Sequence, residues 1–119
     1  MLKQKNSQLQ GNIGLAISIA YFTSVGCIVC IPLNDIQDYD LIVDYGNKSV
    51  KTIQVKTTRC LERGKYKVEL RTSGKSFTKN KSDYLFIVDG DGKRYLIPRE
   101  NVTAKNAITL GANYSQYII

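Results

Sequence analysis

Three polar residues of the sequence, Asp40, Gln54 and Lys56, are of the types that can together hydrolyse a phosphodiester bond. A carboxylate can hold a divalent cation, which polarises a phosphoryl oxygen and activates water. A lysine positions the nucleophile or offsets the charge that develops on the phosphate. The same residues also fit an ordinary solvent-facing pattern in which polar and apolar side chains alternate. The residue types alone therefore leave both interpretations open.

Two strands joined by a tight turn would bring these residues together. Residues 39–43 and 50–57 are apolar and β-branched, and Asp44–Lys48 between them has the composition of a hairpin turn. On the second strand Gln54 and Lys56 point to one face, because side chains alternate along a strand. An antiparallel pairing about the turn places Asp40 opposite residue 53 or 54. We therefore expect the three side chains to converge at one edge of a sheet.

A helix is expected before these strands, from an N-cap at Ser7 to a left-handed residue at Gly26. Its apolar residues form two adjoining stripes, Leu9, Ile13, Ala16, Ile17 and Ala20 on one and Leu15, Ile19 and Phe22 on the other. The wide apolar arc indicates packing on a sheet and against a second surface, for which a partner subunit is one candidate. Gly11 and Gly14 weaken a helix by about 1 kcal/mol each, so we expect them to allow close backbone packing.

The remaining pattern predicts further strands and an α+β fold. Besides 39–43 and 50–57, strands are expected at 27–33, 66–71, 84–88 and 94–97. Residues 72–82 form a basic, polar loop. Residues 101–107 read as a short helix or a loop, and 114–119 as an edge strand. One helix thus precedes a mostly antiparallel sheet.

Length and composition indicate one cytoplasmic domain spanning residues 1–119. The chain is 43% hydrophobic, enough for an ordinary core. No apolar run approaches the roughly 20 residues that span a bilayer, and the first residues lack the apolar run of a signal peptide. We therefore expect no membrane partner.

The positive charge of the chain is concentrated in one segment. The net charge is +7, yet residues 48–81 contain eleven Lys and Arg against two Glu, directly after four aspartates. A basic surface beside concentrated carboxylates suits phosphate binding when a cation lies between them. A solvated basic face is the other interpretation. The candidate DNA contacts are Lys67 and Arg71 for bases, Lys75, Lys79 and Lys81 for phosphates, and Arg59.

An ordered series of segments resembles the PD-(D/E)XK nuclease superfamily, and within it the small homing endonucleases encoded in group I introns. The segments are GNIGL from residue 11, YFTSVG from 21, IPLND from 31, YDLIVD from 39 and IQVKTT from 53, and more weakly DYLFIV from 83 and YLIP from 95. The resemblance implies a restriction-endonuclease-like αβββαβ core, with the N-terminal helix packed on a mixed, mostly antiparallel sheet. It also implies that Asp40 binds metal, that Lys56 is the catalytic lysine, and that Gln54 occupies the position of the second acid.

The sequence departs from that pattern at two places. Many members carry a Glu on the first helix where this chain has Leu15, and residues 72–82 are short for a long helix between strands. The expected metal ligands are therefore Asp40, Gln54 and the Val55 carbonyl, with Asp44 or Glu69 as further candidates. The missing acid leaves a weakened or inactive catalyst open.

We expect a Mg²⁺-dependent, site-specific endonuclease of the homing type that acts on double-stranded DNA, with Mn²⁺ able to substitute. Cleavage of both strands by one small domain predicts a homodimer or homotetramer. Two other hypotheses stay open. One is a structure-specific nuclease similar to a Holliday-junction resolvase, and the other is a non-catalytic DNA-binding module with a decayed nuclease site.

Overall fold

The computed structural model describes residues 6–34, 38–71 and 81–119 of the chain. Its elements in chain order are α1 (Asn6–Ser24), β1 (Ile28–Cys30), β2 (Leu41–Asp44), β3 (Val50–Thr57), β4 (Leu61–Glu62), β5 (Lys65–Glu69), β6 (Tyr84–Val88), β7 (Arg94–Pro98), the 3₁₀ helix η2 (Arg99–Asn101), β8 (Ala107–Leu110) and the 3₁₀ helix η3 (Ala112–Tyr117). One helix precedes the strands, as expected.

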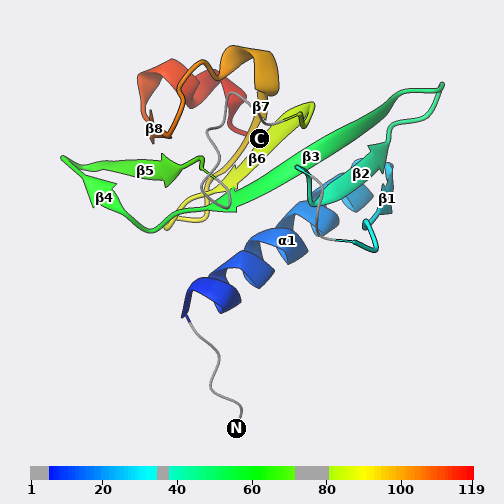
Figure 1. Cartoon of the computed structure of the whole chain (residues 1–119), viewed down its shortest axis with the longest axis horizontal. Coiled ribbons are helices and arrows are strands. Elements are labelled where there is room, and N and C mark those ends of the chain that lie inside the picture. The colour runs from blue at the N-terminus through cyan, green and yellow to red at the C-terminus, as the bar shows by residue number, and fades with distance from the viewer. Residues whose placement is uncertain (1–5, 35–37, 72–80) are drawn as a thin grey trace, which may run out of the picture.

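The strands form two sheets. The larger sheet has the order β1-β2-β3-β6-β7, in which β3 and β6 are parallel and the other neighbours are antiparallel. The smaller sheet has the order β4-β5-β8 and is antiparallel. Figure 1 shows α1 running along one side of the larger sheet, with the smaller sheet on its other side.

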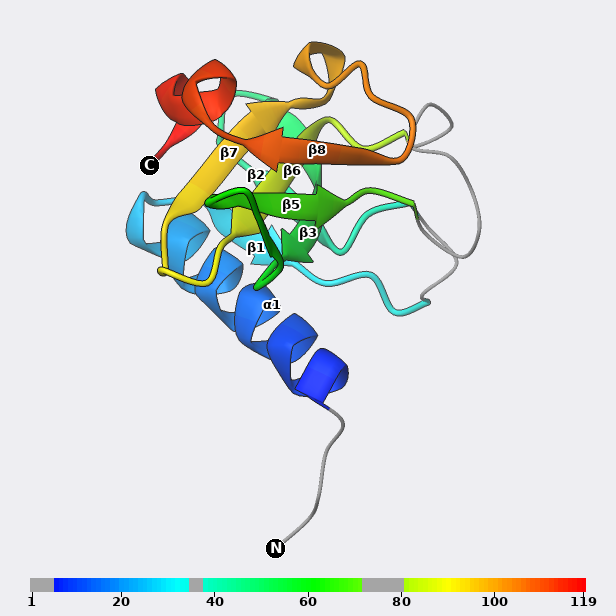
Figure 2. The same cartoon turned by 90° about the vertical axis from the view of Figure 1, so that its left-hand side faces the viewer.

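The two faces of the larger sheet are covered by two separate apolar clusters. On one face Phe22 of α1 packs with a group of buried strand residues, Leu41, Val43, Ile53, Phe86 and Val88. On the other face the smaller sheet covers β6 and β7, and the buried residues include Val68, Leu85, Ile87, Ile97 and Ile108. Figure 2 shows β5 and β8 lying across the larger sheet. This helix–sheet–sheet arrangement confirms the expected α+β class.

The β2–β3 hairpin has the register that the sequence predicts. Leu41 pairs with Ile53, and the Asp40 N–H donates to the Ile53 carbonyl at 2.8 Å, so Asp40 lies opposite Gln54. The turn contains positive φ angles at Gly46, Asn47 and Lys48, which Gly and Asn adopt at low cost. The turn composition and the alternation of the strands together fix this register.

The face of α1 that meets the sheet follows the second predicted stripe, because Phe22 is buried and Leu15 and Ile19 pack against the apolar cluster. Gly14, Ser18 and Phe22, four residues apart, are the buried positions. Leu9 and Ile13 of the first predicted stripe are instead 46% and 41% exposed. The lack of a side chain at Gly14 permits a closer approach to Thr57 of β3 than a larger residue would. This packing explains Gly14, whereas a Cβ at Gly11 meets no described atom within 4 Å.

Two strands were not expected from the sequence, and one expected strand is a 3₁₀ helix. β4 and β8 are short, and β8 lies inside the C-terminal region that the pattern left undefined. The predicted edge strand 114–119 is mostly η3, and only Ile118 makes an isolated bridge, to Tyr95. The strands predicted at 50–57 and 84–88 have the observed bounds of β3 and β6.

The connection between β3 and β6 contains the β4–β5 hairpin. Residues 72–80 of the same connection lie outside the described residues. Among the residues that the structure describes, α1 is the one α-helix. Helix α1 is not long and apolar enough to cross a membrane, and no other described helix is.

The close approach at Gly14 makes a stability prediction. A Cβ at Gly14 would lie 2.3 Å from Thr57 Cγ2, so we expect Gly14→Ala to lower the free energy of unfolding by about 1–3 kcal/mol despite the better helix propensity of Ala. Gly11→Ala is the matched control and should gain up to about 1 kcal/mol. Urea denaturation monitored by circular dichroism measures both.

A second substitution tests the cause of that loss. Thr57→Ser removes the methyl group that would clash with the added Cβ. In a Thr57→Ser background, Gly14→Ala should therefore lower the free energy of unfolding much less than it does in wild type. Equal stabilities of Gly14→Ala and Gly11→Ala would contradict the close packing.

Candidate active site

The carboxylate of Asp40 is held by the strand next to it. Its Oδ2 accepts hydrogen bonds from the Val55 N–H at 2.7 Å and from Gln54 Nε2 at 3.1 Å. Asp40 lies one residue before β2, so the hairpin register brings it beside β3 without a long loop. Both hydrogen bonds go to the same oxygen, which leaves Oδ1 for a further ligand.

Lys56 lies on the same face of β3 as Gln54. Gln54 pairs with Leu85 and Lys56 with Ile87 on β6, and both of these residues belong to the cluster under the smaller sheet. Gln54 is buried and Lys56 is half-buried. The predicted alternation is therefore confirmed, since Ile53 faces α1.

Burial changes the proton affinities of both charged groups. Burial raises the pKa of Asp40, against the opposing effects of the Val55 N–H and the positive charge of Lys56. Burial lowers the pKa of Lys56, against the negative charges of Asp40 and Glu69. Opposed pKa shifts in neighbouring charged groups are typical of sites that do chemistry.

A hollow of about 360 Å³ opens beside Lys56. It is lined by residues from three elements or their ends, namely Ser7, Gln10 and Gly11 of α1, Val55, Lys56 and Thr57 of β3, and Glu69 and Arg71 at the end of β5. Its charged lining is two basic side chains and one carboxylate. A phosphate with a bound cation has the complementary charge.

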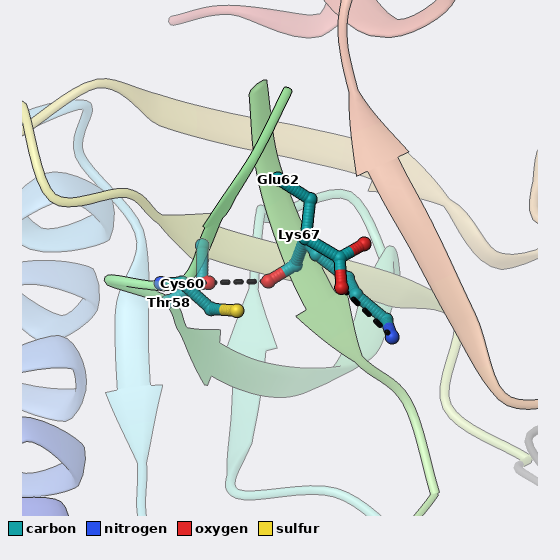
Figure 3. Close-up of polar contacts among 4 residues, drawn as sticks. All are labelled: Thr58, Cys60, Glu62 and Lys67. Carbon is teal, nitrogen blue, oxygen red and sulfur yellow. Dashed lines mark hydrogen bonds and ion pairs between the residues drawn. The ribbon is translucent and has the colours of Figure 1, made fainter. Parts of the chain in front are cut away.

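Thr58, the residue directly after β3, makes hydrogen bonds to β5 and β6. The Thr58 hydroxyl donates to the Lys67 carbonyl, and the Thr58 N–H donates to the Val88 carbonyl at 3.0 Å. Figure 3 shows the contact between Thr58 and Lys67, together with the Glu62–Lys67 ion pair. Thr58 is buried. Sequence reasoning did not identify Thr58, because a single threonine after a strand carries no distinctive signal.

The structure brings together most of the site predicted from the sequence. Asp40, Gln54 and the Val55 backbone are joined by hydrogen bonds, and Lys56 interacts with Asp40 through charge. Arg71, expected on DNA bases, lies in the same hollow as Lys56. Leu15, at the place of the missing helix acid, packs against the apolar cluster between α1 and the sheet.

The other basic residues predicted to contact DNA are dispersed. Lys67 pairs with Glu62 at 3.6 Å, and Arg59 is exposed after β3. Lys81 is exposed, and its N–H donates to Asp38 Oδ2 at 3.2 Å. Lys75 and Lys79 lie outside the described residues.

The oxygen atoms of Asp40, Gln54 and Val55 are of the kind that bind a hard divalent cation, although only one of these residues carries a carboxylate. Asp40 supplies one carboxylate, and Gln54 and the Val55 carbonyl add neutral oxygens of the type that Mg²⁺ accepts. Within residues 6–34, 38–71 and 81–119, no three His, Cys, Asp or Glu side chains are grouped to hold a metal. A cation here would therefore depend on few carboxylates.

The raised pKa of Asp40 predicts a gain in stability when its charge is removed. Since the folded pKa lies above the ordinary value of 3.8, ionised Asp40 costs stability, and this cost appears as pH rises from the unfolded pKa through the folded one. Asp40→Asn keeps an acceptor for the Val55 N–H and stays neutral. We expect its free energy of unfolding at pH 7, with EDTA, to exceed that of wild type.

The comparison of unfolding curves at pH 4 and pH 7 checks this cause. The advantage of Asp40→Asn should shrink at the lower pH, whereas Glu100→Gln on exposed η2 should differ from wild type by less than about 0.5 kcal/mol at both values. An advantage that does not change with pH would contradict the role of the buried charge.

Comparisons with known proteins show the fold and, separately, the family. A comparison with curated proteins finds no match. The structure is similar to that of a bacterial homing endonuclease, I-Ssp6803I, with a TM-score of 0.80 and 22% sequence identity, over 97% of this chain and 88% of that chain. This likeness shows a shared fold. A sequence model of PD-(D/E)XK endonucleases matches residues 5–110, and because that match spans most of the sequence, the chain belongs to the PD-(D/E)XK endonuclease family.

Proposed function

We propose that this protein is a divalent-cation-dependent endonuclease that cleaves double-stranded DNA at specific sites. The observation that carries the proposal is the grouping of Asp40, Gln54 and Lys56 on one face of the β2–β3 hairpin, beside a hollow lined by Lys56 and Arg71. Membership of the PD-(D/E)XK endonuclease family supports the reaction class. The similarity to a homing endonuclease supports site-specific cutting.

Each residue of the group has a distinct role in this proposal. PD-(D/E)XK nucleases generally use divalent cations, and we assign Mg²⁺ here, with Mn²⁺ able to replace it. Asp40 binds the cation through the oxygen that its hydrogen bonds leave open, and Gln54 orients Asp40. The bound cation supplies polarisation of the phosphoryl oxygen and activation of water. The Lys56 ammonium positions the attacking water and offsets the charge that develops on the phosphate.

The outer face of β5 and the segment after it are proposed to contact the DNA. Lys67, Glu69 and Arg71 alternate with the buried Val68 and Leu70, so they point away from the core. A β-ribbon can enter the major groove, where Arg and Lys bind guanine edges. We assign Arg71 and Lys67 to bases, and Lys81 to a phosphate with Lys75 and Lys79. Arg59 joins this basic surface.

Cleavage of both strands requires two sites, so we propose that copies of the chain associate, as a dimer or a tetramer. Leu9 and Ile13 form an exposed apolar stripe on α1 that supports such an association. The unfilled acid position at Leu15 favours one alternative function, a DNA-binding module whose nuclease site has decayed.

Loss of Lys56 should abolish cleavage without loss of the fold. We expect Lys56→Ala to cut DNA at least about 100-fold more slowly than wild type, because it removes a charge aimed at the phosphate. Lys51→Ala is the matched control, since Lys51 lies on the same strand and faces the other side. The measurement is Mg²⁺-dependent cutting of a plasmid library of random sequences, with sequencing of the ends.

Two outcomes of this assay, and one of a separate competition between DNA substrates, have distinct meanings. Cutting that EDTA stops and Lys56→Ala loses supports the proposed function. Equal inactivity of wild type and Lys56→Ala, with intact DNA binding, would indicate the decayed module. Preference for a four-way junction over a linear duplex in competition would indicate a structure-specific nuclease.

The salt dependence of DNA binding separates phosphate contacts from base contacts. Lys81→Gln should reduce the slope of log K against log salt by about 1 and weaken all sequences alike. Arg71→Gln should instead cost about 1–3 kcal/mol on preferred sequences and little on others. Fluorescence anisotropy without divalent cations measures both, and uniform weakening by Arg71→Gln would show that it contacts phosphate.

A further inference from the structure

The larger sheet has two outer strands, and the C-terminal segment covers the edge of one of them. Along β7, Tyr95 forms a bridge with Ile118, and the Ile119 N–H donates to the Arg94 carbonyl at 2.9 Å. At the other edge, β2 is the one strand among the described residues that pairs with β1, and Figure 1 shows β1 at that end of the sheet. An open edge offers its N–H and C=O groups to a further strand, and proteins usually block it with charged side chains or a covering segment.

The direction of the backbone groups of β1 follows from the hairpin beside it. The Tyr45 N–H donates to the Ser49 carbonyl at 2.8 Å, so the backbone groups of Tyr45 point toward β3. Alternate residues of an antiparallel strand bond to opposite sides, so Asp44 bonds toward β1, where its partner is Ile28. The backbone groups of Ile28 therefore point to β2, and those of Val29 point outward.

The outer edge continues to Ile31, two residues after Val29. Ile31 precedes Pro32, and the residue before a proline favours an extended backbone, which directs the Ile31 N–H and C=O to the same side as those of Val29. The side chains along this edge are apolar and exposed, since Ile28 is 65% exposed, Ile31 is 62% exposed and Leu33 is fully exposed. The edge thus combines backbone groups that can pair with apolar side chains that a partner would cover.

The distribution of charge favours a second copy of this chain as that partner. Residues 6–34 contain no Asp, Glu, Lys or Arg, whereas the whole chain has a net charge of +7. Two copies therefore repel each other least where these residues meet. An acidic partner would be attracted to the basic segment 48–81 instead. A strand that pairs with itself across a twofold axis needs no other complementary sequence, and a charge at that axis would face its like.

We propose that two copies of this chain pair antiparallel through β1, centred on Cys30, and so join their larger sheets into one. Val29 of each copy then exchanges both backbone hydrogen bonds with Ile31 of the other copy. The two Cys30 residues lie opposite each other between these bonds, as a non-hydrogen-bonded pair whose Cα atoms are about 4.5 Å apart. The inference rests on the proposed function in that cleavage of both strands requires two copies, and it names the surface that joins them.

Oxidation of a single thiol tests the register of this pairing. The Cys27→Ala/Cys60→Ala variant keeps the exposed Cys30, and a Cα separation of about 4.5 Å is within the range that a disulfide bridges. With diamide as the oxidant and DNA-free protein at micromolar concentration, we expect a disulfide-linked dimer on non-reducing gels. The Cys27→Ala/Cys30→Ala control keeps the exposed Cys60 and should crosslink at least about tenfold more slowly, because its thiols meet only by diffusion. Equal rates would overturn the pairing at Cys30.

Sedimentation equilibrium without oxidant measures the association itself. Cys30→Lys places two positive charges opposite each other, so we expect it to raise the dimer dissociation constant at least about tenfold. Leu61→Lys is the matched control, because Leu61 is an exposed apolar residue on β4, and it should stay within about twofold of wild type. Circular dichroism melts confirm that each variant is folded.

The outcomes separate this interface from the proposed function. Association that Cys30→Lys leaves unchanged would overturn the β1 interface alone, and another surface would then join the copies. A wild-type chain that stays monomeric at micromolar concentration, both free and on DNA, would overturn the interface and the proposed cleavage of both strands together. Loss of cleavage in Lys56→Ala is measured independently of either result.

Discussion

The site depends on one constraint, the hydrogen bond from the Val55 N–H to the Asp40 carboxylate at 2.7 Å. A backbone N–H in a strand has a fixed direction, so this bond fixes the position of the carboxylate against β3, independent of the conformation of the exposed loops. It also explains why a partly buried carboxylate is tolerated, since the N–H offsets part of the cost of burial. Gln54 and Lys56 take their places relative to Asp40 from the same strand.

Helix α1 combines apolar packing with one close approach to β3. Phe22, Leu15 and Ile17 pack in the apolar cluster of the larger sheet, whereas Gly14 lies so close to Thr57 that a Cβ would come within 2.3 Å of Cγ2. This close approach brings the first turns of α1 to the hollow where Lys56 lies. A glycine within a helix costs stability, and natural sites commonly trade stability for such placement.

The features predicted correctly from the sequence are those governed by local rules. The register of Asp40 against Gln54 follows from a turn composition and from period-2 alternation, both of which act over a few residues. The sequence left open which apolar stripe of α1 meets the sheet, because apolar residues surround most of the helix. In the structure Leu15, Ile19 and Phe22 pack on the sheet, and Leu9 and Ile13 remain exposed. β8 was missed because a strand of four residues, 107–110, acquires its structure from pairing with β5, far away in the sequence.

The distribution of charge also acquires a different meaning once the chain is folded. Along the sequence, Glu69 is one of two acids within a basic segment and reduces the net positive charge of that segment. In three dimensions the segment divides: Lys56, Glu69 and Arg71 meet at the hollow, whereas Lys67 turns to Glu62 on the outer sheet. Net charge along a sequence therefore describes the attraction of the surface for DNA. The path of β5 past Thr58 places Glu69, and not Glu62, at the hollow beside Lys56.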